Sequence, residues 1–316
     1  MKKLAKNISL FFIFSLFLYA AYITVFAIFT PSFFTPNLKY RIGGPGHTYS
    51  RLSEVKKTRN VDVLFLGSSH AYRGFDTRMY EHVGIKSFNL GTSAQTPIQT
   101  KILLHRYLDN LHPKLVIYEV YPATFMLDGV ESSLDLIAND RNDFGSFKMA
   151  LKLNNVKTYN SLIYGIVRDI FNLNTNHVES AKKGDDLYVS GGFVERKVQH
   201  FKPISNGKED IKINTNQLTA FTQVMRLLKE KNIKTILVNA PIAPIKYHEY
   251  SNTQYFDSLM QTYADYYNFN NILHLNDSLH FYDSHHLNQI GVKIFNEQLI
   301  EIIKEKKLLP SQETSL

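Results

Sequence analysis

A serine stands directly after a short apolar run, where a tight turn could present its side chain for chemistry. The run covers residues 61–66 (VDVLFL), and Gly67, Ser68, Ser69 and His70 follow it. In a parallel sheet the carboxyl ends of the strands face the ligand crevice, so a serine here meets a ligand with its backbone N–H free. Ser69 is therefore a candidate nucleophile. The competing interpretation is an ordinary turn in which the serine caps a helix.

A carboxylate and an imidazole lie three residues apart near the other end of the chain, in the stretch DSHHLN that begins at Asp283. Asp283 can accept a hydrogen bond from one ring nitrogen of His286. The other ring nitrogen is then free to take a proton from a serine hydroxyl, which is otherwise too weak a nucleophile. Ser69, Asp283 and His286 are thus predicted to form a catalytic triad, unless Asp283 and Asn288 only cap the helix that follows.

A metal site is the other chemistry that this stretch suggests, because His280, Asp283, His285 and His286 lie close together in the sequence. A coordination sphere needs ligands that the stretch alone does not supply, and the sequence shows no second cluster to complete it. The chain also has no cysteine. The sequence therefore predicts no metal and no cofactor.

Three further polar side chains lie next to these motifs or at the end of a strand. His70 and Arg73 follow the serine turn and are candidates for binding an anionic group of a substrate. Packing or exposure to water is the competing interpretation. Glu119 ends the third apolar run and is expected to face solvent, with a buried acid as the alternative.

The elements that position these residues alternate along the chain as βα units do. Short apolar runs predict strands, and stretches with apolar residues three and four apart predict helices. The five strands are 61–66, 87–90, 115–120, 235–239 and 271–275, and the helices are 96–108, 217–231, 253–266 and 289–307. Strands this apolar are buried on both faces, so we predict an α/β fold with a five-stranded parallel sheet between two layers of helices.

The folded domain is expected to cover residues 60–309, with one insertion, 125–213, between the third and fourth strands. Loops of that length without secondary structure are uncommon in compact domains, so helices are predicted within it, at 146–153 and 161–173. Residues 185–202, around Gly191 and Gly192, are predicted to form a loop or a small hairpin. The polar tail, 310–316, is expected to fray.

The first thirty residues contain an apolar segment long enough to cross a membrane. Residues 8–29 carry no charge and follow three lysines. As a helix they extend over roughly 33 Å, against a bilayer core of about 30 Å. The sequence predicts a transmembrane anchor over residues 1–30 and a juxtamembrane linker rich in proline and glycine over 31–59. A cleaved signal peptide and a buried core helix are the alternatives.

Composition and charge narrow the partners and the location. The chain has 316 residues, with 36 Lys and Arg against 28 Asp and Glu, for a net charge of +8. These basic residues form no stripe with interleaved aromatics, so nucleic acid is not a predicted partner. The single apolar segment near the N-terminus predicts a single-pass protein of the bacterial cytoplasmic membrane, with its C-terminal domain on the outer side.

The serine motif and the Asp-x-x-His motif, in this order and at the edge of one predicted sheet, resemble those of the SGNH (GDSL-like) hydrolase family. Ser69 falls on the serine of the family's Gly-Asp-Ser motif, with Ser68 in place of the aspartate. Asp283 and His286 fall on its Asp-x-x-His, and the family's Leu-Asn-x-x-Gly pattern follows.

The resemblance covers residues 60–124 and 214–307 and extends to a second motif. The sequence Asn-Leu-Gly that ends at Gly91 resembles the family's Asn-x-Gly turn after the second strand. The resemblance implies a flavodoxin-like fold and an oxyanion hole to which the backbone N–H groups of Ser69 and Gly91 contribute.

The chain departs from that family after the third predicted strand. The family has Gly-x-Asn-Asp there, and this chain has Tyr-Pro-Ala-Thr at residues 121–124. The asparagine that completes the oxyanion hole is therefore missing from its place. Either Thr124 or a residue of the insertion supplies the third donor, or the hole has two donors and the activity is lower.

In this departure and in its predicted N-terminal anchor, the chain resembles a group of anchored envelope proteins. The group includes proteins that resemble the D-alanyl transfer protein of teichoic acid synthesis and the alginate acetylation proteins. The resemblance implies an esterase or O-acyltransferase that acts on acyl esters of a cell-envelope glycan or polymer. A polytopic membrane acyltransferase is then a candidate partner. The alternative is a non-catalytic SGNH-like protein that binds such an enzyme or the polymer. The sequence does not separate a hydrolase from a transferase, because both use the same triad.

Overall fold

The structure of the chain is a computed structural model that describes residues 1–35, 38, 42–173, 176–205 and 207–310. It forms two compact units. Unit 1 comprises residues 1–43 and 133–178, and unit 2 comprises residues 44–132 and 179–316. Unit 1 therefore joins the N-terminal segment to the middle of the predicted insertion.

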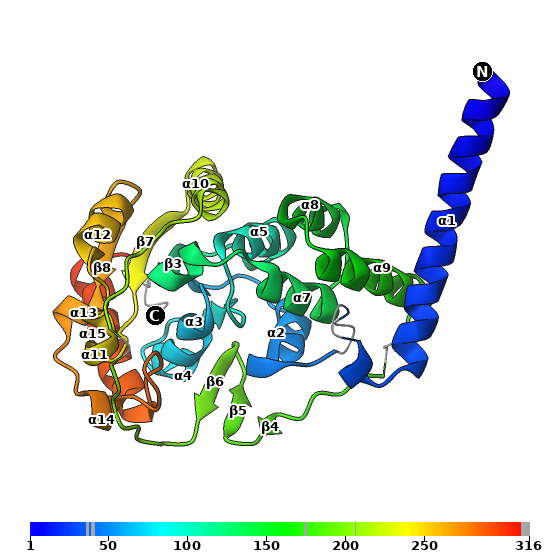
Figure 1. The fold of residues 1–316 in the computed structure, drawn as a ribbon. Helices are drawn as coiled ribbons and strands as arrows, with labels where there is room; N and C mark the ends of the chain where they lie inside the picture. The colour runs from blue at the N-terminus through cyan, green and yellow to red at the C-terminus, as the bar shows by residue number, and fades with distance from the viewer. Residues whose placement is uncertain (36–37, 39–41, 174–175, 206, 311–316) are drawn as a thin grey trace, which may run out of the picture. The chain divides into compact units, whose positions relative to one another are not determined.

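Unit 2 is built on a five-stranded parallel sheet (Figure 1). Its strands, in the order in which they lie side by side, are β2 (Ser87–Asn89), β1 (Val63–Leu66), β3 (Leu115–Glu119), β7 (Lys234–Asn239) and β8 (Asp265–Asn268). Every neighbouring pair is parallel. Counted within this sheet alone, the order is 2-1-3-4-5, which is that of flavodoxin-like folds. The predicted α/β class and five-stranded parallel sheet are confirmed.

Helices of two lengths accompany this sheet. The longer helices of unit 2 are α2 (Thr48–Val55), α5 (Pro97–Leu111), α10 (Thr215–Glu230), α12 (Thr253–Gln261) and α15 (Gln289–Glu305). The short ones are η2 (Pro45–His47), α3 (Ser69–Gly74), α4 (Thr77–Glu81), α6 (Pro122–Met126), α11 (Pro244–Tyr247), α13 (Phe269–Ile272) and α14 (Asp277–His280).

These helices cover both faces of the sheet, because its central strands are apolar on both. All five residues of β3 are buried, and neighbouring side chains of a strand point to opposite faces. Ile117 joins a cluster with residues of α15. The ring of Tyr118 instead meets Phe221 of α10, with 5.5 Å between the ring centroids. α10 lies beside β7 and packs against α5 (Figure 1). The sheet is therefore the middle of three layers.

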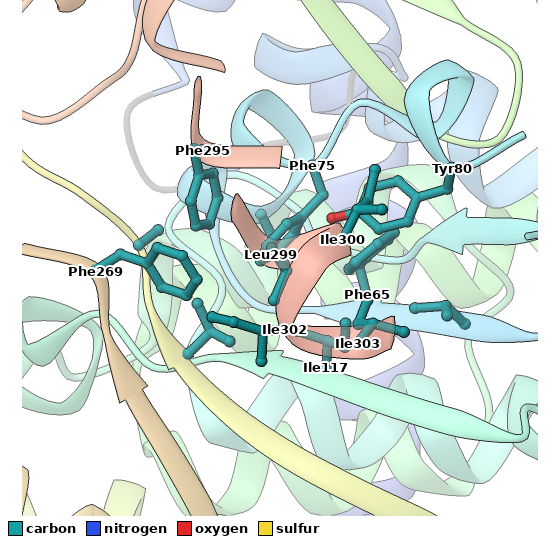
Figure 2. Close-up of a cluster of buried hydrophobic side chains, with 14 of the residues drawn as sticks. Phe65, Phe75, Tyr80, Ile117, Phe269, Phe295, Leu299, Ile300, Ile302 and Ile303 are labelled. Carbon is teal, nitrogen blue, oxygen red and sulfur yellow. The ribbon is translucent and has the colours of Figure 1, made fainter. Parts of the chain in front are cut away.

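An apolar cluster between the sheet and α15 holds the helix that follows β1 (Figure 2). Phe65 of β1 stacks on Phe75 with 4.4 Å between centroids, and Phe75 lies 5.4 Å from Phe295 of α15. Phe269 meets Phe295 at 4.8 Å. All four rings are fully buried. Because Phe75 directly follows α3, the cluster fixes the position of that helix, whose first residue is Ser69.

A small antiparallel sheet forms from the second half of the predicted insertion. Its strands are β4 (Lys182–Lys183), β5 (Asp186–Val189) and β6 (Phe193–Arg196). β5 and β6 make the predicted hairpin around Gly191 and Gly192, and β4 adds a third strand. β6 contacts α3, so the hairpin lies close to the serine turn.

Unit 1 is helical over its described residues, with α1 (Lys2–Phe29), η1 (Ser32–Phe34), α8 (Phe144–Leu153), α9 (Val156–Phe171) and most of α7 (Val130–Asn139). The two predicted helices of the insertion are confirmed as α8 and α9, each of which begins earlier than expected. α1 is long and apolar enough to cross a membrane, and little of it is buried. It packs against α9 (Figure 1).

The fifth predicted strand, 271–275, is wrong. The strand lies earlier, at β8, and helix α12 ends at Gln261, before the predicted limit of 266. β8 is an edge strand whose first three residues are only partly buried or exposed, so its sequence, DYYN, lacks an apolar signature. Leu273 and Leu275 are apolar because they pack against the core cluster and not because they pair in the sheet.

A helix, α2, lies within residues 31–59, where the sequence predicts a linker. Leu52 and Val55 are fully buried, and the guanidinium of Arg51 lies 4.6 Å from the centroid of the Tyr72 ring. The part of this segment from Gly44 onward thus belongs to unit 2. Residues 36–37 and 39–41 of the segment, and all of the predicted tail except Pro310, lie outside the described residues.

We expect Phe75→Ala to destabilise unit 2 by about 3–5 kcal/mol, because it leaves a cavity between buried rings. Urea unfolding of the full-length protein in detergent measures the change in the free energy of unfolding. Tyr255→Ala is the matched control, since that ring is 58% exposed, and its loss should change the free energy by no more than about 0.5 kcal/mol. Equal effects of the two substitutions would contradict the packing described for Phe75.

Candidate active site

The serine turn joins β1 to α3 through a backbone conformation that favours glycine. Gly67 has φ of 138°, and a Cβ at this position would lie 2.6 Å from Oε2 of Glu119. The hydroxyl of Ser68 caps α3 by accepting the N–H of His70 at 3.3 Å. Ser69 is the first residue of the helix and is partly exposed. The turn thus presents Ser69 at the carboxyl end of the sheet, where the sequence predicts it.

The structure brings the three predicted triad residues together. The hydroxyl of Ser69 lies 2.8 Å from Nε2 of His286. Nδ1 of the same ring lies 3.0 and 2.9 Å from the two carboxylate oxygens of Asp283. This chain of carboxylate, imidazole and hydroxyl is the arrangement by which a serine oxygen is activated for attack on a carbonyl.

Asp283 is oriented by its own loop. Its Oδ1 accepts the backbone N–H groups of His285 and His286, both at 2.8 Å. An antiparallel bridge between Phe281 and Leu287 closes the loop. Burial opposes the charged form, but the hydrogen bond and the charge of His286, together with the two N–H groups, outweigh it and hold the pKa of Asp283 well below its ordinary value. The carboxylate therefore stays ionised beside the imidazole at neutral pH.

The ring of His286 packs against two other rings in stacked geometry. Tyr282 lies 5.4 Å away, centroid to centroid, with 4° between the ring planes. His70 lies 5.0 Å away with 22° between the planes. His70 in turn packs on Tyr121 at 4.1 Å. These contacts restrict rotation of the imidazole and keep its Nε2 directed at Ser69.

His70 is buried against the imidazole of His286. Burial, and then the charges of His286 and His285, lower the pKa of His70 well below its usual value, so the ring is neutral at physiological pH. Its Nδ1 lies 3.2 Å from the hydroxyl of Ser68. A buried neutral ring offers an anionic group little to bind. The structure therefore places His70 where it supports His286, and substrate binding by this residue stays an untested prediction.

Arg73 is already paired within the protein. Its guanidinium donates two hydrogen bonds to Asp186 of β5, at 2.9 and 2.8 Å, and Arg196 of β6 reaches the same carboxylate at 3.1 Å. Both guanidinium groups lie over the ring of Tyr282, at 5.8 and 4.7 Å from its centroid. The hairpin β5–β6 is thereby tied to the tyrosine that stacks on His286, and substrate binding by Arg73 stays an untested prediction.

The expectation that Glu119 faces solvent is wrong. This side chain is 2% exposed. Its Oε2 accepts both the backbone N–H and the hydroxyl of Ser68, each at 3.1 Å. Its Oε1 is buried with no hydrogen-bond partner among the described residues. Burial raises the pKa of Glu119 to about 7, although the hydrogen bonds from Ser68 favour the charged form. In the sequence, the signal for this site is a single acid at the end of an otherwise uncharged strand.

The two predicted oxyanion donors, the backbone N–H groups of Ser69 and Gly91, differ in whether they already donate a hydrogen bond. Ser69 is the first residue of α3, where N–H groups have no acceptor within the helix. Gly91 lies against the turn, and a Cβ there would be 2.8 Å from the carbonyl oxygen of Ser68. Its N–H, however, donates to Oδ1 of Asn89 at 3.1 Å. Gly91 would have to exchange this hydrogen bond to bind an oxyanion.

Tyr121 occupies the place where the motif Gly-x-Asn-Asp is missing. Its carbonyl accepts the hydroxyl of the buried Thr124 at 2.7 Å, so that hydroxyl proton is already donated. The hydroxyl of Tyr121 lies 2.9 Å from Nδ1 of His285 and 3.1 Å from the hydroxyl of Tyr250. This group holds a second imidazole 6.2 Å from that of His286, centroid to centroid. Sequence reasoning missed the group because Tyr250 lies far from the motifs in the chain.

Comparisons with known proteins find likeness in structure alone. A scan against family models finds no match, and no curated protein matches the chain significantly. Among solved structures, one similar chain is a Bacteroides fragilis protein provisionally described as an acylhydrolase, with 11% identity and a TM-score of 0.42 over 84% of this chain and 99% of its own. Another is a GDSL-like lipase of Bacteroides thetaiotaomicron, with 15% identity and a TM-score of 0.40 over 79% of this chain and 90% of its own. Similarity at this level assigns no activity to the chain.

We expect Glu119→Gln to remove a pH dependence of stability. The pKa of about 7 lies above the ordinary value of 4.5, so the fold favours the protonated acid. Its contribution is complete below about pH 4.5 and is lost as the pH rises to about 7, a change of about 3 kcal/mol. Glutamine still offers Ser68 an acceptor but does not ionise. Unfolding measured from pH 4 to pH 8 should therefore favour the variant increasingly at higher pH, and a difference that is constant over this range would contradict the burial of a titrating acid.

Proposed function

We propose that this protein is a serine-dependent esterase or O-acyltransferase. The observation that carries the proposal is the hydrogen-bonded chain from Asp283 through His286 to Ser69, with 2.8 Å between the imidazole and the hydroxyl. An isolated serine hydroxyl is a weak nucleophile. A neutral imidazole in this position takes the hydroxyl proton as the oxygen attacks a carbonyl carbon.

In the first step, Oγ of Ser69 forms a bond to the carbonyl carbon of the ester while Nε2 of His286 takes the proton. Asp283 stabilises the imidazolium that results. When the tetrahedral intermediate collapses, the bond to the alcohol oxygen breaks, and the imidazolium returns the proton to the leaving alcohol. Water or a sugar hydroxyl then attacks the acyl-enzyme, with His286 again as the base. Water yields the free acid, and a sugar hydroxyl yields a new ester.

The backbone N–H of Ser69 is the donor that we assign to the oxyanion first. Gly91 is the second, after it releases the side chain of Asn89. Donors of this kind contribute about 2.7–4 kcal/mol each to the transition state. The prior engagement of Gly91 is the observation that favours the alternative, a non-catalytic protein that binds an envelope polymer or a membrane acyltransferase.

The substrate that we propose is an acyl ester of a cell-envelope glycan or polymer, on the outer side of a bacterial cytoplasmic membrane. Helix α1 supports this proposal because its length and hydropathy suit a membrane span. The resemblance of the motifs to those of anchored envelope proteins supports it as well. A polytopic membrane acyltransferase that supplies acyl groups is the partner that the transferase form requires.

A serine-reactive fluorophosphonate tests the activated serine in the full-length protein in detergent. We expect wild-type protein to be labelled, and Ser69→Ala and His286→Ala to lose labelling, because the first lacks the nucleophile and the second the base. Asp283→Asn should slow labelling by a factor on the order of 10³–10⁴, since it disturbs the orientation and tautomer of the imidazole.

Two exposed residues provide matched controls for these substitutions, Ser258 and His274. Ser258→Ala and His274→Ala should be labelled at the wild-type rate. Hydrolysis of p-nitrophenyl acetate should follow the same pattern. Absence of labelling in wild-type protein whose far-UV circular dichroism shows it to be folded would favour the non-catalytic alternative.

The proposed topology is testable because the chain contains no cysteine. We expect Ser258→Cys, in unit 2, to react with a membrane-impermeant maleimide on intact bacterial cells. Asn7→Cys, near the start of α1, should react only after the cells are lysed. The reverse pattern would place unit 2 in the cytoplasm, and a shortened Ser258→Cys protein in the culture medium would indicate a cleaved signal peptide.

A further inference from the structure

Helix α8 exposes a row of large apolar side chains. Phe144, Phe147 and Leu151 are all exposed, Phe144 to 67%. Their spacing of three and then four residues places them on one face of the helix, whereas Met149 on the opposite face is buried. The rings of Phe144 and Phe147 stack on each other with 6.2 Å between centroids. This face therefore has no protein covering it among the described residues.

Helix α9, which packs against α8, also exposes apolar side chains toward its C-terminal end. Ile166 is exposed, and Ile170 and Phe171 are 66% and 68% exposed. Apolar surface of this extent on a protein marks a site that something else covers in the functional state.

The position of α9 against α1 indicates what covers this surface. The hydroxyl of Tyr19 on α1 donates to the side chain of Asn160 on α9 at 2.7 Å, and Ile23 and Ala27 form a buried cluster with Tyr164. Tyr19 lies ten residues before Phe29, the end of α1, which is roughly 15 Å along a helix. If α1 crosses a bilayer, α9 contacts the half of the span between Tyr19 and Phe29. It then lies at the level of the acyl chains and headgroups.

The charges of α8 also suit a lipid surface. Lys148 and Lys152 are exposed beside the apolar face, and the helix contains no acidic residue. The ammonium group of Lys148 lies 4.5 Å from the centroid of the Phe144 ring. Helices that lie in a membrane interface combine aromatic and aliphatic side chains on one face with lysines that reach anionic headgroups.

We propose that α8 and α9 lie in the membrane interface beside α1, with Phe147, Ile170 and Phe171 inserted among the lipid acyl chains. The proposal commits to a bilayer as the occupant of this face, because the same unit contains the apolar span. It rests on the anchor of the proposed function and is independent of catalysis by Ser69. Unit 1 would then be a membrane-embedded platform and not only a tether.

Intrinsic fluorescence tests this proposal, because the chain contains no tryptophan. Phe147→Trp and Phe171→Trp each introduce one reporter into the full-length protein, which is reconstituted in vesicles of ordinary or brominated phosphatidylcholine. We expect blue-shifted emission and about a twofold loss of intensity in brominated vesicles, since the side chains of interfacial helices lie within about 10 Å of the headgroup boundary.

Two further single-tryptophan variants serve as references. Tyr22→Trp, at an exposed position of α1, should be quenched and shows that the anchor is inserted. Tyr255→Trp, at an exposed position of unit 2, should emit as in water and resist quenching.

Quenching of Tyr22→Trp without quenching of Phe147→Trp and Phe171→Trp would overturn the proposal while leaving the anchor intact. Blue-shifted emission of these two variants without quenching would also overturn it, because a protein surface and not lipid would then cover the face. Absence of quenching in Tyr22→Trp would overturn both the anchor and this inference, and labelling of Ser69 would be unaffected by any of these outcomes.

Discussion

The site depends on the close approach of three strand ends around one turn. In the order β2-β1-β3, the turn after β1 lies between the ends of its two neighbours. A side chain at Gly67 would collide with Glu119 at the end of β3, and one at Gly91 would collide with the carbonyl of Ser68. The absence of both side chains lets the turn settle between the strand ends, where Glu119 holds Ser68 and leaves Ser69 pointing outward. The hydroxyl can then meet an imidazole that arrives from the other end of the chain.

The surroundings shift the pKa values of two carboxyl groups near this turn in opposite directions. Asp283 accepts hydrogen bonds from the imidazole and from two backbone N–H groups, and these outweigh the effect of its burial on the pKa. At Glu119 burial dominates and raises the pKa, although the hydrogen bonds from Ser68 favour the charged form. The first is therefore a permanent anion that can stabilise an imidazolium. The second is an acid that titrates near neutrality and acts on the position of the turn. The surroundings of each carboxyl group, and not its residue type, decide whether it stays charged, as Asp283 does, or takes up a proton near neutral pH, as Glu119 does.

The contacts around the imidazole of His286 include the β5–β6 hairpin, which lies outside the segments that the resemblance covers. Tyr282 stacks on His286 and lies under the guanidinium groups of Arg73 and Arg196, which share Asp186. The hairpin of the predicted insertion is thus part of the support for the site. The other half of that insertion belongs to unit 1 with the apolar span. The predicted insertion therefore contains both the hairpin that contacts the site and helices α8 and α9, which we propose to lie in the membrane interface.

The sequence by itself predicted most of the local elements and the three side chains, Ser69, Asp283 and His286, that the structure brings together. Buried strands such as VLFL and LVIYE are recognisable because both faces are apolar, and the triad residues stand in short motifs whose spacing is local. The edge strand β8 was missed because a strand with one covered side needs little apolar character. Only the tertiary structure decided that Glu119 is buried under the serine turn, that Gly91 is engaged by Asn89, and that Tyr282 and His70 pack on His286. Those properties depend on contacts between segments far apart in the chain, and no local pattern of residues encodes which distant side chain will remove water from a given group.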